Sequence, residues 1–305
     1  MINEKTVLVL GAGASKPYGL PLGTELRDSV IRAENNFGLY QKVLGIEFTK
    51  DQYTEFTNTL AHSGFSSVDA FLEENIKWLE IGKAAIALDL LKAEWKSINN
   101  LFPPKQPKDH WYETLWSHLK APSWTTFKKN KISIITFNYD RSLEHYLITL
   151  LCNQYKIRPD IASKGLTSLP LLHVHGHLGS YLNSKGKNSF GNEISKEQFN
   201  IARSGIQIVH ENNGDTPDFL MAQKCIREAK RVLFIGFGFH PKNMAKLAIR
   251  PVREYNAGGI FKIFGTHKGI KSQVWNSICF NYGFAYSAVK QRTGSISDLI
   301  NERIN

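Results

Sequence analysis

Four short clusters of glycine and polar residues have the types and spacing that chemistry needs. Each cluster follows an apolar run that predicts a buried β-strand. The clusters are Gly-Ala-Gly-Ala-Ser at 11–15, Thr-Phe-Asn-Tyr-Asp at 136–140, His-Val-His-Gly-His at 173–177 and Gly-Phe-Gly-Phe-His at 236–240. Because ligands bind at the carboxyl ends of the strands in a parallel sheet, we expect the four clusters to form one shared site.

The first cluster has the features of a phosphate cradle. Gly11 and Gly13 lack the Cβ atoms that would keep a ligand away from the backbone, and glycine permits positive φ. If a helix begins near Ser15, its free N–H groups and the positive end of its dipole face the same spot. The alternative is a plain strand-to-helix turn. Lys16 occupies the place of the third glycine of a dinucleotide-binding fingerprint.

The second and third clusters contain groups for acid–base chemistry. An imidazole whose pKa lies near neutrality can accept a proton from a hydroxyl group or from water. For Asn138 and Asp140 the structural alternative is a helix N-cap, since a helix is predicted to start there. Alternation along a strand would place His173, His175 and His177 on one face, where paired histidines can bind zinc. No carboxylate or cysteine partner is evident, so we expect no metal and expect His173 and His177 to be buried and hydrogen-bonded.

The elements that must position these clusters alternate between strand and helix. Strands are predicted at 6–10, 131–137, 171–175, 231–235 and 260–264, with a short extra strand at 206–209. Helices are predicted at 24–32, 140–151, 218–229 and 243–255, and a flexible loop at 183–192. This alternation favours an α/β fold with a Rossmann-like parallel sheet and helices on both of its faces.

A helical insertion separates the first predicted strand from the second. Strand signals are missing between 37 and 129, and apolar residues recur there at helical spacing over 68–79, 84–95 and 109–119. We therefore predict a catalytic domain made of 1–36 and 130–305, with 37–129 as a helical insertion packed on it. The tryptophans expected to pack between its helices include Trp95, Trp111 and Trp116.

The composition is typical of a globular protein with a substantial core. The 305 residues are 42% hydrophobic and 11% aromatic, and they carry a formal net charge of +11. The basic residues are dispersed, as on a solvated surface; the alternative is that they bind an anionic partner, either a nucleic acid or an acidic protein. No nucleic-acid-binding signature accompanies them, so any contact with nucleic acid is expected to be indirect. Cys152, Cys225 and Cys279 lie far apart, which fits buried thiols in a reducing cytoplasm. No run of about 18 apolar residues and no signal peptide is present, so we expect no membrane contact.

The four clusters, in their order along the chain, resemble the motifs of the sirtuin family. That family has a Gly-Ala-Gly-x-Ser turn, a Thr-x-Asn-x-Asp strand end, a His-Gly strand end and a late Gly-x-Gly turn. Gly19-Leu-Pro21 is also similar to the Gly-Ile-Pro that follows the first glycine turn of the family. The resemblance runs from about Val7 to Gly265 and covers the α/β scaffold but not the helical insertion.

Three departures separate the chain from the sirtuins that remove acyl groups from proteins. It lacks the two Cys-x-x-Cys pairs of their zinc module, and Leu22-Gly23-Thr24 replaces the Asp-Phe-Arg that follows their proline. The helical insertion is the third departure. The chain is therefore more similar to the sirtuin-like proteins of bacterial anti-phage defence, and this resemblance implies hydrolysis of NAD⁺, as the substrate, to nicotinamide and ADP-ribose.

The resemblance also implies roles for individual residues. Asn138 would orient water beside the ribose without adding a permanent charge, and Asp140 would bind nicotinamide or the cationic ribosyl centre. His175 matches the catalytic histidine of the family because it precedes Gly176, which would let the substrate approach closely. The other residues expected to bind NAD⁺ are Gly11, Ala12, Gly13, Ser15, Thr136, Gly236, Gly238, Thr266 and, unless it belongs to the core, Phe239.

An unregulated NADase would poison its own cell, so the resemblance implies an activating partner, ligand or oligomerisation. No second sensor domain is evident, and we expect a protein partner encoded nearby or a homo-oligomer. Two other functions remain open. The chain could be an NAD⁺-dependent deacylase or ADP-ribosyltransferase, although the missing zinc module argues against deacylation. It could instead be a non-catalytic module that binds NAD⁺ or ADP-ribose in a defence complex.

Overall fold

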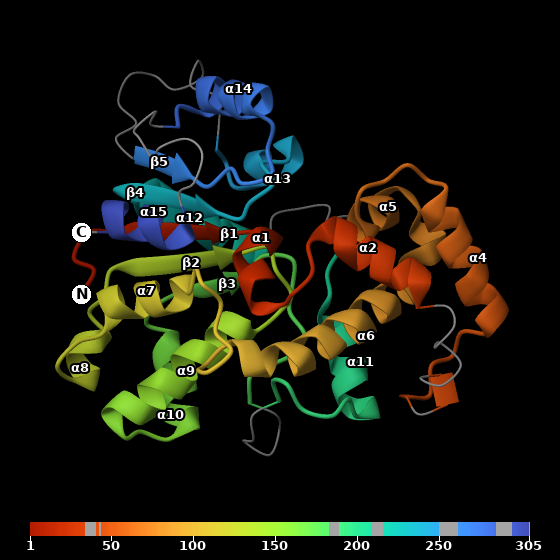
Figure 1. Ribbon diagram of the computed structural model, residues 1–305, viewed down its shortest axis with the longest axis horizontal. Coiled ribbons are helices and arrows are strands. Elements are labelled where there is room, and N and C mark those ends of the chain that lie inside the picture. The colour runs from red at the N-terminus through yellow and green to blue at the C-terminus, as the bar shows by residue number, and fades with distance from the viewer. Residues whose placement is uncertain are drawn as a thin grey trace.

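The computed structural model describes residues 1–33, 41–42, 44–182, 189–208, 216–249, 262–284 and 295–304. Within these ranges the centre of the protein is a sheet of five strands in the order β3-β2-β1-β4-β5 (Figure 1). The strands are β1 (Thr6–Leu10), β2 (Ile132–Thr136), β3 (Leu171–His173), β4 (Arg231–Ile235) and β5 (Lys262–Gly265). All neighbouring strands run parallel, which confirms the predicted α/β fold with a Rossmann-like sheet.

Helices connect these strands and follow the last of them. Before β2 they are α1 (Ala12–Ser15), α2 (Gly23–Arg32), α4 (Lys50–Ala61), α5 (Val68–Glu74), α6 (Leu79–Ser97), α7 (Trp111–Leu119) and α8 (Trp124–Phe127). After β2 they are α9 (Ser142–Tyr155), α10 (Pro159–Leu166), α11 (Lys196–Gly205), α12 (Pro217–Glu228), α13 (Pro241–Lys246), α14 (Ser272–Tyr282) and α15 (Ile296–Arg303). Short 3₁₀ helices are η1 (Lys16–Tyr18), η2 (Ile76–Trp78) and η3 (Ile98–Asn100). The helices predicted at 24–32 and 218–229 are thus confirmed almost to the residue.

Local sequence explains two differences from the predicted elements. The helix after β1 begins at Ala12 and ends at Ser15, where a helix was expected to begin, and the chain continues as the 3₁₀ helix η1, because Pro17 has no N–H for the next α-helical hydrogen bond. The helix predicted at 68–79 is interrupted at Asn75, which has non-helical dihedral angles. In place of the short strand predicted from 206, Ile206 makes one antiparallel bridge with Gly176. Parts of five predicted segments lie outside the described residues: 37–40 with 43, 183–188, Val209, 250–255 and 260–261.

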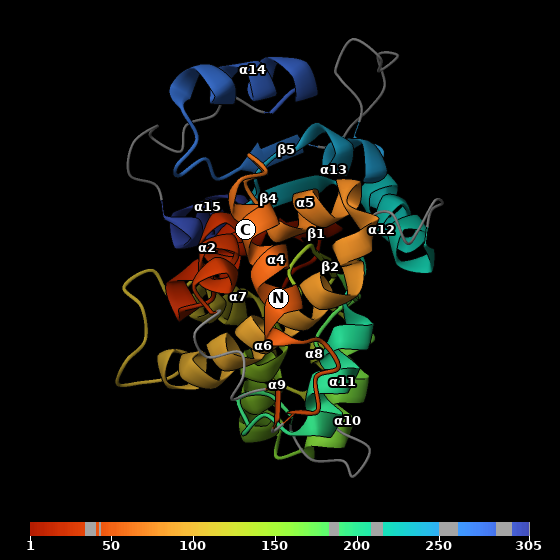
Figure 2. The same ribbon diagram turned by 90° about the vertical axis from the view of Figure 1, so that its right-hand side faces the viewer.

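Alternate residues along each strand face two different helical layers. Leu8 and Leu10 of β1 belong to a core that includes α7, α9 and α15. Val7 and Val9 belong to a core that includes α12, α13 and α14. This is the pattern of a parallel strand buried on both faces. Figure 2 shows the strands between α14 on one side and α9 and α10 on the other.

A third core lies away from the sheet and joins α2, α4, α5, α6 and α11, most of which form the right-hand lobe of Figure 1. The predicted insertion at 37–129 therefore contributes to two cores, because α4 to α6 belong to this lobe whereas α7 and α8 pack beside the sheet. Trp111 is fully buried and Trp116 partly buried, as expected. Trp95 is 57% exposed, which corrects its predicted place between helices, since it faces solvent near the end of α6.

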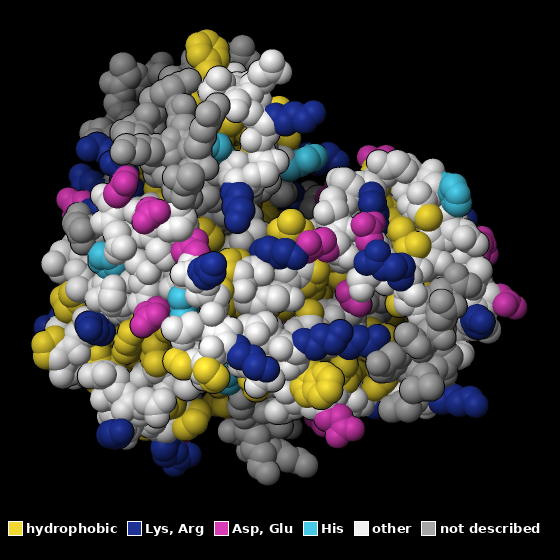
Figure 3. All heavy atoms as spheres, viewed as in Figure 1, with side chains coloured by type: hydrophobic (Ala, Val, Ile, Leu, Met, Phe, Trp, Pro, Cys, Tyr) yellow, Lys and Arg dark blue, Asp and Glu magenta, His cyan; other side chains and the backbone are white. Residues whose placement is uncertain are grey.

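Basic side chains are dispersed over the face of the molecule that Figure 3 draws. Figure 3 shows Lys and Arg spread over one face of the molecule, among acidic and apolar side chains, rather than gathered in one patch. In the ranges given above, no helix combines the length and the apolar character that crossing a bilayer requires.

Candidate functional site

The four predicted clusters meet at one edge of the sheet. Leu10 of β1 is in register with Thr136 of β2 and Ile235 of β4, and Thr136 is in register with His173 of β3. Because the strands are parallel, the residues that follow these four positions emerge at the same edge. The neighbours of β1 are β2 on one side and β4 on the other. This makes the edge a topological switch point, where open α/β sheets bind ligands.

Two glycine turns pack directly against each other at this edge. Gly11 N–H donates to the Ile235 carbonyl (3.0 Å), and Gly13 N–H donates to the Gly236 carbonyl (2.9 Å). A Cβ atom on Gly11 would lie 2.6 Å from the Gly236 carbonyl oxygen, and one on Gly236, whose φ is +57°, would overlap the Ala14 nitrogen. Glycine is therefore required here for contact between backbones. The N–H groups of Gly11 and Gly13 are therefore not free to bind a phosphate, which weakens the phosphate-cradle hypothesis.

The turn after β4 places its predicted NAD⁺-binding residues in different surroundings. The Thr266 hydroxyl accepts a hydrogen bond from Gly236 N–H (2.8 Å), so Thr266 fixes the turn. Phe239 is 4% exposed and packs edge-on against Trp275, which places it in the core. Gly238 is exposed, and a Cβ atom there would meet nothing within 4 Å. Backbone packing therefore does not explain why glycine stands at position 238.

Asn138 joins the second cluster to the first. Its Nδ2 donates to the Gly11 carbonyl and to the Ser15 hydroxyl, both at 3.0 Å, and its backbone N–H donates to the Thr136 hydroxyl at 3.0 Å. Its Oδ1 accepts no hydrogen bond from any described residue. Ala12 is partly exposed at the same turn. The structure thus brings these predicted residues together and leaves the Asn138 carboxamide oxygen available to a ligand.

Asp140 binds the start of α9. One of its carboxylate oxygens accepts from the Ser142 N–H (3.1 Å) and from the Ser142 hydroxyl, which also lies 2.7 Å from the Tyr112 hydroxyl. Burial raises the pKa of Asp140. Asp140, Asn138 and Tyr112 line a cavity of about 10 Å³, close to the smallest volume that holds a water molecule. The N-cap position of α9 is Arg141, so neither Asn138 nor Asp140 is the N-cap that was their structural alternative. Asp140 bonds the first residue of α9 from just outside the helix, and it also lines a cavity beside Asn138.

His175 packs with the α12 layer and not with Asn138. Its ring centroid lies 4.9 Å from that of Phe137 and 5.9 Å from that of Phe219. Burial and the charge of Lys246 lower the pKa of His175 to about 4, so the ring is neutral at physiological pH. Its Nε2 is buried without a hydrogen-bond partner. In the described part of the chain no hydrogen bond or ring contact joins His175 to Asn138.

The three clustered histidines do not share a face, which corrects the prediction from strand alternation. β3 ends at His173, two residues before the predicted end, and the chain then turns, with Gly176 at φ +80°. A Cβ atom on Gly176 would overlap the Gly205 carbonyl oxygen, so this position also needs glycine for backbone packing. The rings of His173 and His177 lie 5.5 Å apart, on the α9 side. The turn carries His175 to the opposite layer.

Glu144 is the carboxylate partner that sequence analysis missed. His173 Nδ1 donates to the Asn138 carbonyl (2.8 Å), and His173 Nε2 lies 2.5 Å from a Glu144 carboxylate oxygen. Burial alone would lower the pKa of His173, but the charge and hydrogen bond of Glu144 outweigh it and the pKa is raised. The one signal in the sequence was spacing, since Glu144 follows Asp140 by four residues at the start of a predicted helix.

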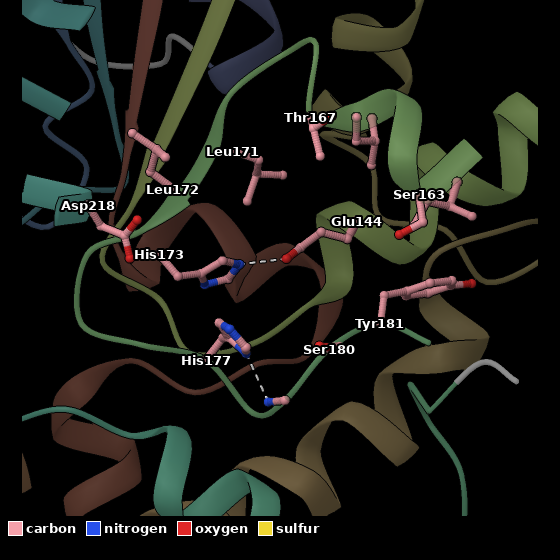
Figure 4. Close-up of a pocket in the computed structure, with 13 residues that line it drawn as sticks. Glu144, Ser163, Thr167, Leu171, Leu172, His173, His177, Ser180, Tyr181 and Asp218 are labelled. Carbon is pink, nitrogen blue, oxygen red and sulfur yellow. Dashed lines mark hydrogen bonds and ion pairs between the residues drawn. The ribbon is translucent and has the colours of Figure 1, made fainter. Parts of the chain in front are cut away.

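The His173–Glu144 pair also lines a pocket of about 300 Å³ beside β3 (Figure 4). Its other walls come from α10, the segment after β3 and the start of α12, and they include Ser163, Tyr181 and Asp218. Within the described ranges, no group of three or more His, Cys, Asp or Glu residues is arranged to hold a metal ion.

A buried ion pair connects the third core to the site. Arg141, which follows Asp140, places a guanidinium nitrogen 2.5 Å from the carboxylate of Glu94 on α6, and both side chains are at most 2% exposed. The Arg141 guanidinium also donates to the Ser189 hydroxyl (2.6 Å) and the Ser180 carbonyl (3.3 Å). Sequence analysis missed this pair because its members are 47 residues apart.

Comparisons with known proteins do not assign the chain to a family. No protein-family model matches it, and the search of curated proteins found no match. The resemblance to sirtuin-like proteins therefore remains a hypothesis based on four motifs.

Proposed function

We propose that this protein is an NAD⁺ glycohydrolase, which uses water to cleave NAD⁺ into nicotinamide and ADP-ribose. The observation that carries the proposal is the way Asn138 is held. Its amide group donates to Gly11 and Ser15, which leaves its oxygen to accept a hydrogen bond from water. The nicotinamide ring is already cationic in NAD⁺, so its departure needs no carboxylic acid of the kind that glycosidases use. A fixed, uncharged group that orients water suits this reaction.

The position of Asn138 supports NAD⁺ as the substrate. Doubly wound sheets bind dinucleotides at the switch point of the carboxyl edge, which here lies between β1 and β4. Exposed Gly238 offers backbone to a ligand beside this edge. The cavity that Asn138 and Asp140 line, of about 10 Å³, is close to the smallest volume that holds one water molecule, which fits hydrolysis.

The placement of His175 supports an enzyme that is inactive until it is rearranged. A proton acceptor in this reaction must reach the ribose or the water, whereas His175 packs against Phe137 and Phe219. We propose that a partner protein, a ligand or self-assembly moves the turn at 174–177 and brings the neutral imidazole to Asn138. In line with the resemblance to anti-phage proteins, the activated enzyme would deplete NAD⁺ during phage infection.

Nicotinamide release from NAD⁺ tests the proposal. The purified protein is assayed alone and with the proteins encoded beside it, as wild type, Asn138→Ala and His175→Ala. His62→Ala is the matched control, because His62 is exposed and bonds to its own helix. We expect each site variant to lose turnover by on the order of 10²-fold and the control to keep it. The absence of nicotinamide release in every mixture would refute the proposal.

A non-catalytic module that binds NAD⁺ or ADP-ribose is the second candidate. The observation that favours it is the lack of contact between His175 and Asn138. In that case calorimetry would detect NAD⁺ binding without nicotinamide release, and the affinity would be the same in wild type, Asn138→Ala and His175→Ala.

A further inference from the structure

His173 faces a hydrogen-bond acceptor with each of its ring nitrogens. Nδ1 lies 2.8 Å from the Asn138 carbonyl oxygen, and Nε2 lies 2.5 Å from a Glu144 carboxylate oxygen, the contact dashed in Figure 4. A carbonyl oxygen and an ionised carboxylate oxygen can only accept. The ring must therefore donate from both nitrogens, which it does only as an imidazolium. The short contact with Glu144 is typical of a charge-assisted hydrogen bond.

The groups around His173 favour a cation at this position. Glu144 on α9, Asp140 just before α9, His177 after β3 and Asp218 on α12 interact with the ring or line the pocket around it. Three of the four are carboxylic acids. The pKa of His173 is raised because Glu144 outweighs burial, whereas the pKa of His177 is lowered by burial and by the charge of His173.

We propose that His173, kept charged by Glu144, is a positioning residue that holds the main chain of Asn138 in place for catalysis. Asn138 is then fixed at two points, since its carbonyl binds His173 and its carboxamide binds Gly11 and Ser15. Rotation of the peptide after Asn138 would shift the carboxamide oxygen from the water it orients. The kinetic consequence of this inference rests on the proposed NAD⁺ hydrolysis, whereas the structural consequence can be measured without NAD⁺.

Imidazole ¹⁵N NMR of the full chain tests the charge of His173. We expect both ring nitrogens to carry protons at about pH 7.5 in wild type. In Glu144→Gln, which keeps the shape but removes the charge, the imidazolium should persist only to a lower pH. A neutral ring in wild type, or a pKa that Glu144→Gln leaves unchanged, would overturn the inference.

The side-chain amide signals of Asn138 test the positioning role. In His173→Gln we expect these protons to exchange with water at least about tenfold faster than in wild type, because one anchor of the loop is lost. His177→Gln is the matched control, since its ring lies 5.5 Å from that of His173 and no contact in the described structure joins it to Asn138. If His173→Gln fails to fold, Glu144→Gln provides the same readout. Exchange at the wild-type rate in the site variant would contradict the proposal.

Turnover separates this inference from the proposed function. For Glu144→Gln we expect kcat to fall, at unchanged KM, as pH rises through the lowered pKa of His173, while wild-type kcat stays level to a higher pH. His173→Gln should lose kcat by on the order of 10²-fold. If the wild-type protein has a charged His173 and an ordered Asn138 but releases no nicotinamide, the proposed NAD⁺ hydrolysis is refuted and the structural part of this inference is not. Normal turnover in both variants would overturn the positioning role.

Discussion

Glycine has two different uses among the residues at the sheet edge. Gly11, Gly13 and Gly236 allow two turns to approach within backbone contact, and their N–H and carbonyl groups bond to each other's turns or strands. Gly238 instead borders open space. A motif whose sequence indicates a ligand cradle therefore serves in part to pack the protein against itself, whereas packing does not require glycine at position 238.

Two alanine substitutions separate these uses. Gly236→Ala should lower the free energy of unfolding by roughly 2–4 kcal/mol, because alanine is strained at positive φ and its Cβ overlaps Ala14. Gly238→Ala should change the free energy of unfolding by less than about 0.5 kcal/mol but raise the KM for NAD⁺. Chemical denaturation and steady-state kinetics measure the two effects. Equal destabilisation by both substitutions would contradict this assignment.

Helices from the predicted insertion support the site at the level of elements. On α7, Trp111 donates its ring N–H to the Ala14 carbonyl (2.8 Å), which holds the turn after β1. On α6, Glu94 binds both the backbone and the guanidinium of Arg141, directly before α9. The loop that carries Asn138 and Asp140 therefore ends at Arg141, which Glu94 on α6 holds in place.

Glu94→Ala should lower the free energy of unfolding by about 3–5 kcal/mol, because it leaves the Arg141 charge buried and uncompensated. The double variant Glu94→Leu/Arg141→Met should recover much of this loss, since it removes both charges at similar volume. Urea denaturation measures each free energy. Glu228→Ala is the control, because the Lys5–Glu228 pair is exposed and should contribute little. Independent, additive effects at 94 and 141 would argue against the pairing.

At the scale of the whole molecule, four buried histidines should each make the protein less stable in acid. Burial is the main cause that lowers the pKa of His110, His145, His175 and His177, to about 4 for His145 and His175. In the unfolded chain these side chains regain a pKa near 6.5. As pH falls below that value, the unfolded state takes up protons that the folded state cannot, and stability is lost until the folded pKa is reached.

Between about pH 7 and pH 5, His145 alone should remove about 2 kcal/mol from the free energy of unfolding. His145→Gln should therefore flatten the dependence on pH over this range, even though it also loses the stacking of His145 on Phe190. Urea unfolding at a series of pH values measures the slope. The exposed control His62→Gln should keep the wild-type slope, and an unchanged slope in His145→Gln would show that His145 is not the neutral, buried group inferred here.

The sequence by itself determined the sheet and the four clusters at its edge. The apolar runs of β1, β2 and β4 are local signals, because a parallel strand buried on both faces needs no polar alternation. Their meeting at one edge also followed, since parallel strands end on the same side. The placing of polar residues such as Asn138 at this edge was therefore predictable without knowledge of distant contacts.

Only the tertiary structure decided which side chains meet. His173 and Glu144 are 29 residues apart, and Glu94 and Arg141 are 47 apart. Periodicity identifies neighbours within one helix or strand, but pairing across elements depends on how the cores pack. His175 is turned from Asn138 because the chain leaves β3 at His173 and bends at Gly176 against α11. Such long-range packing has no local signature, so the residue types at the sheet edge were predictable and their arrangement was not.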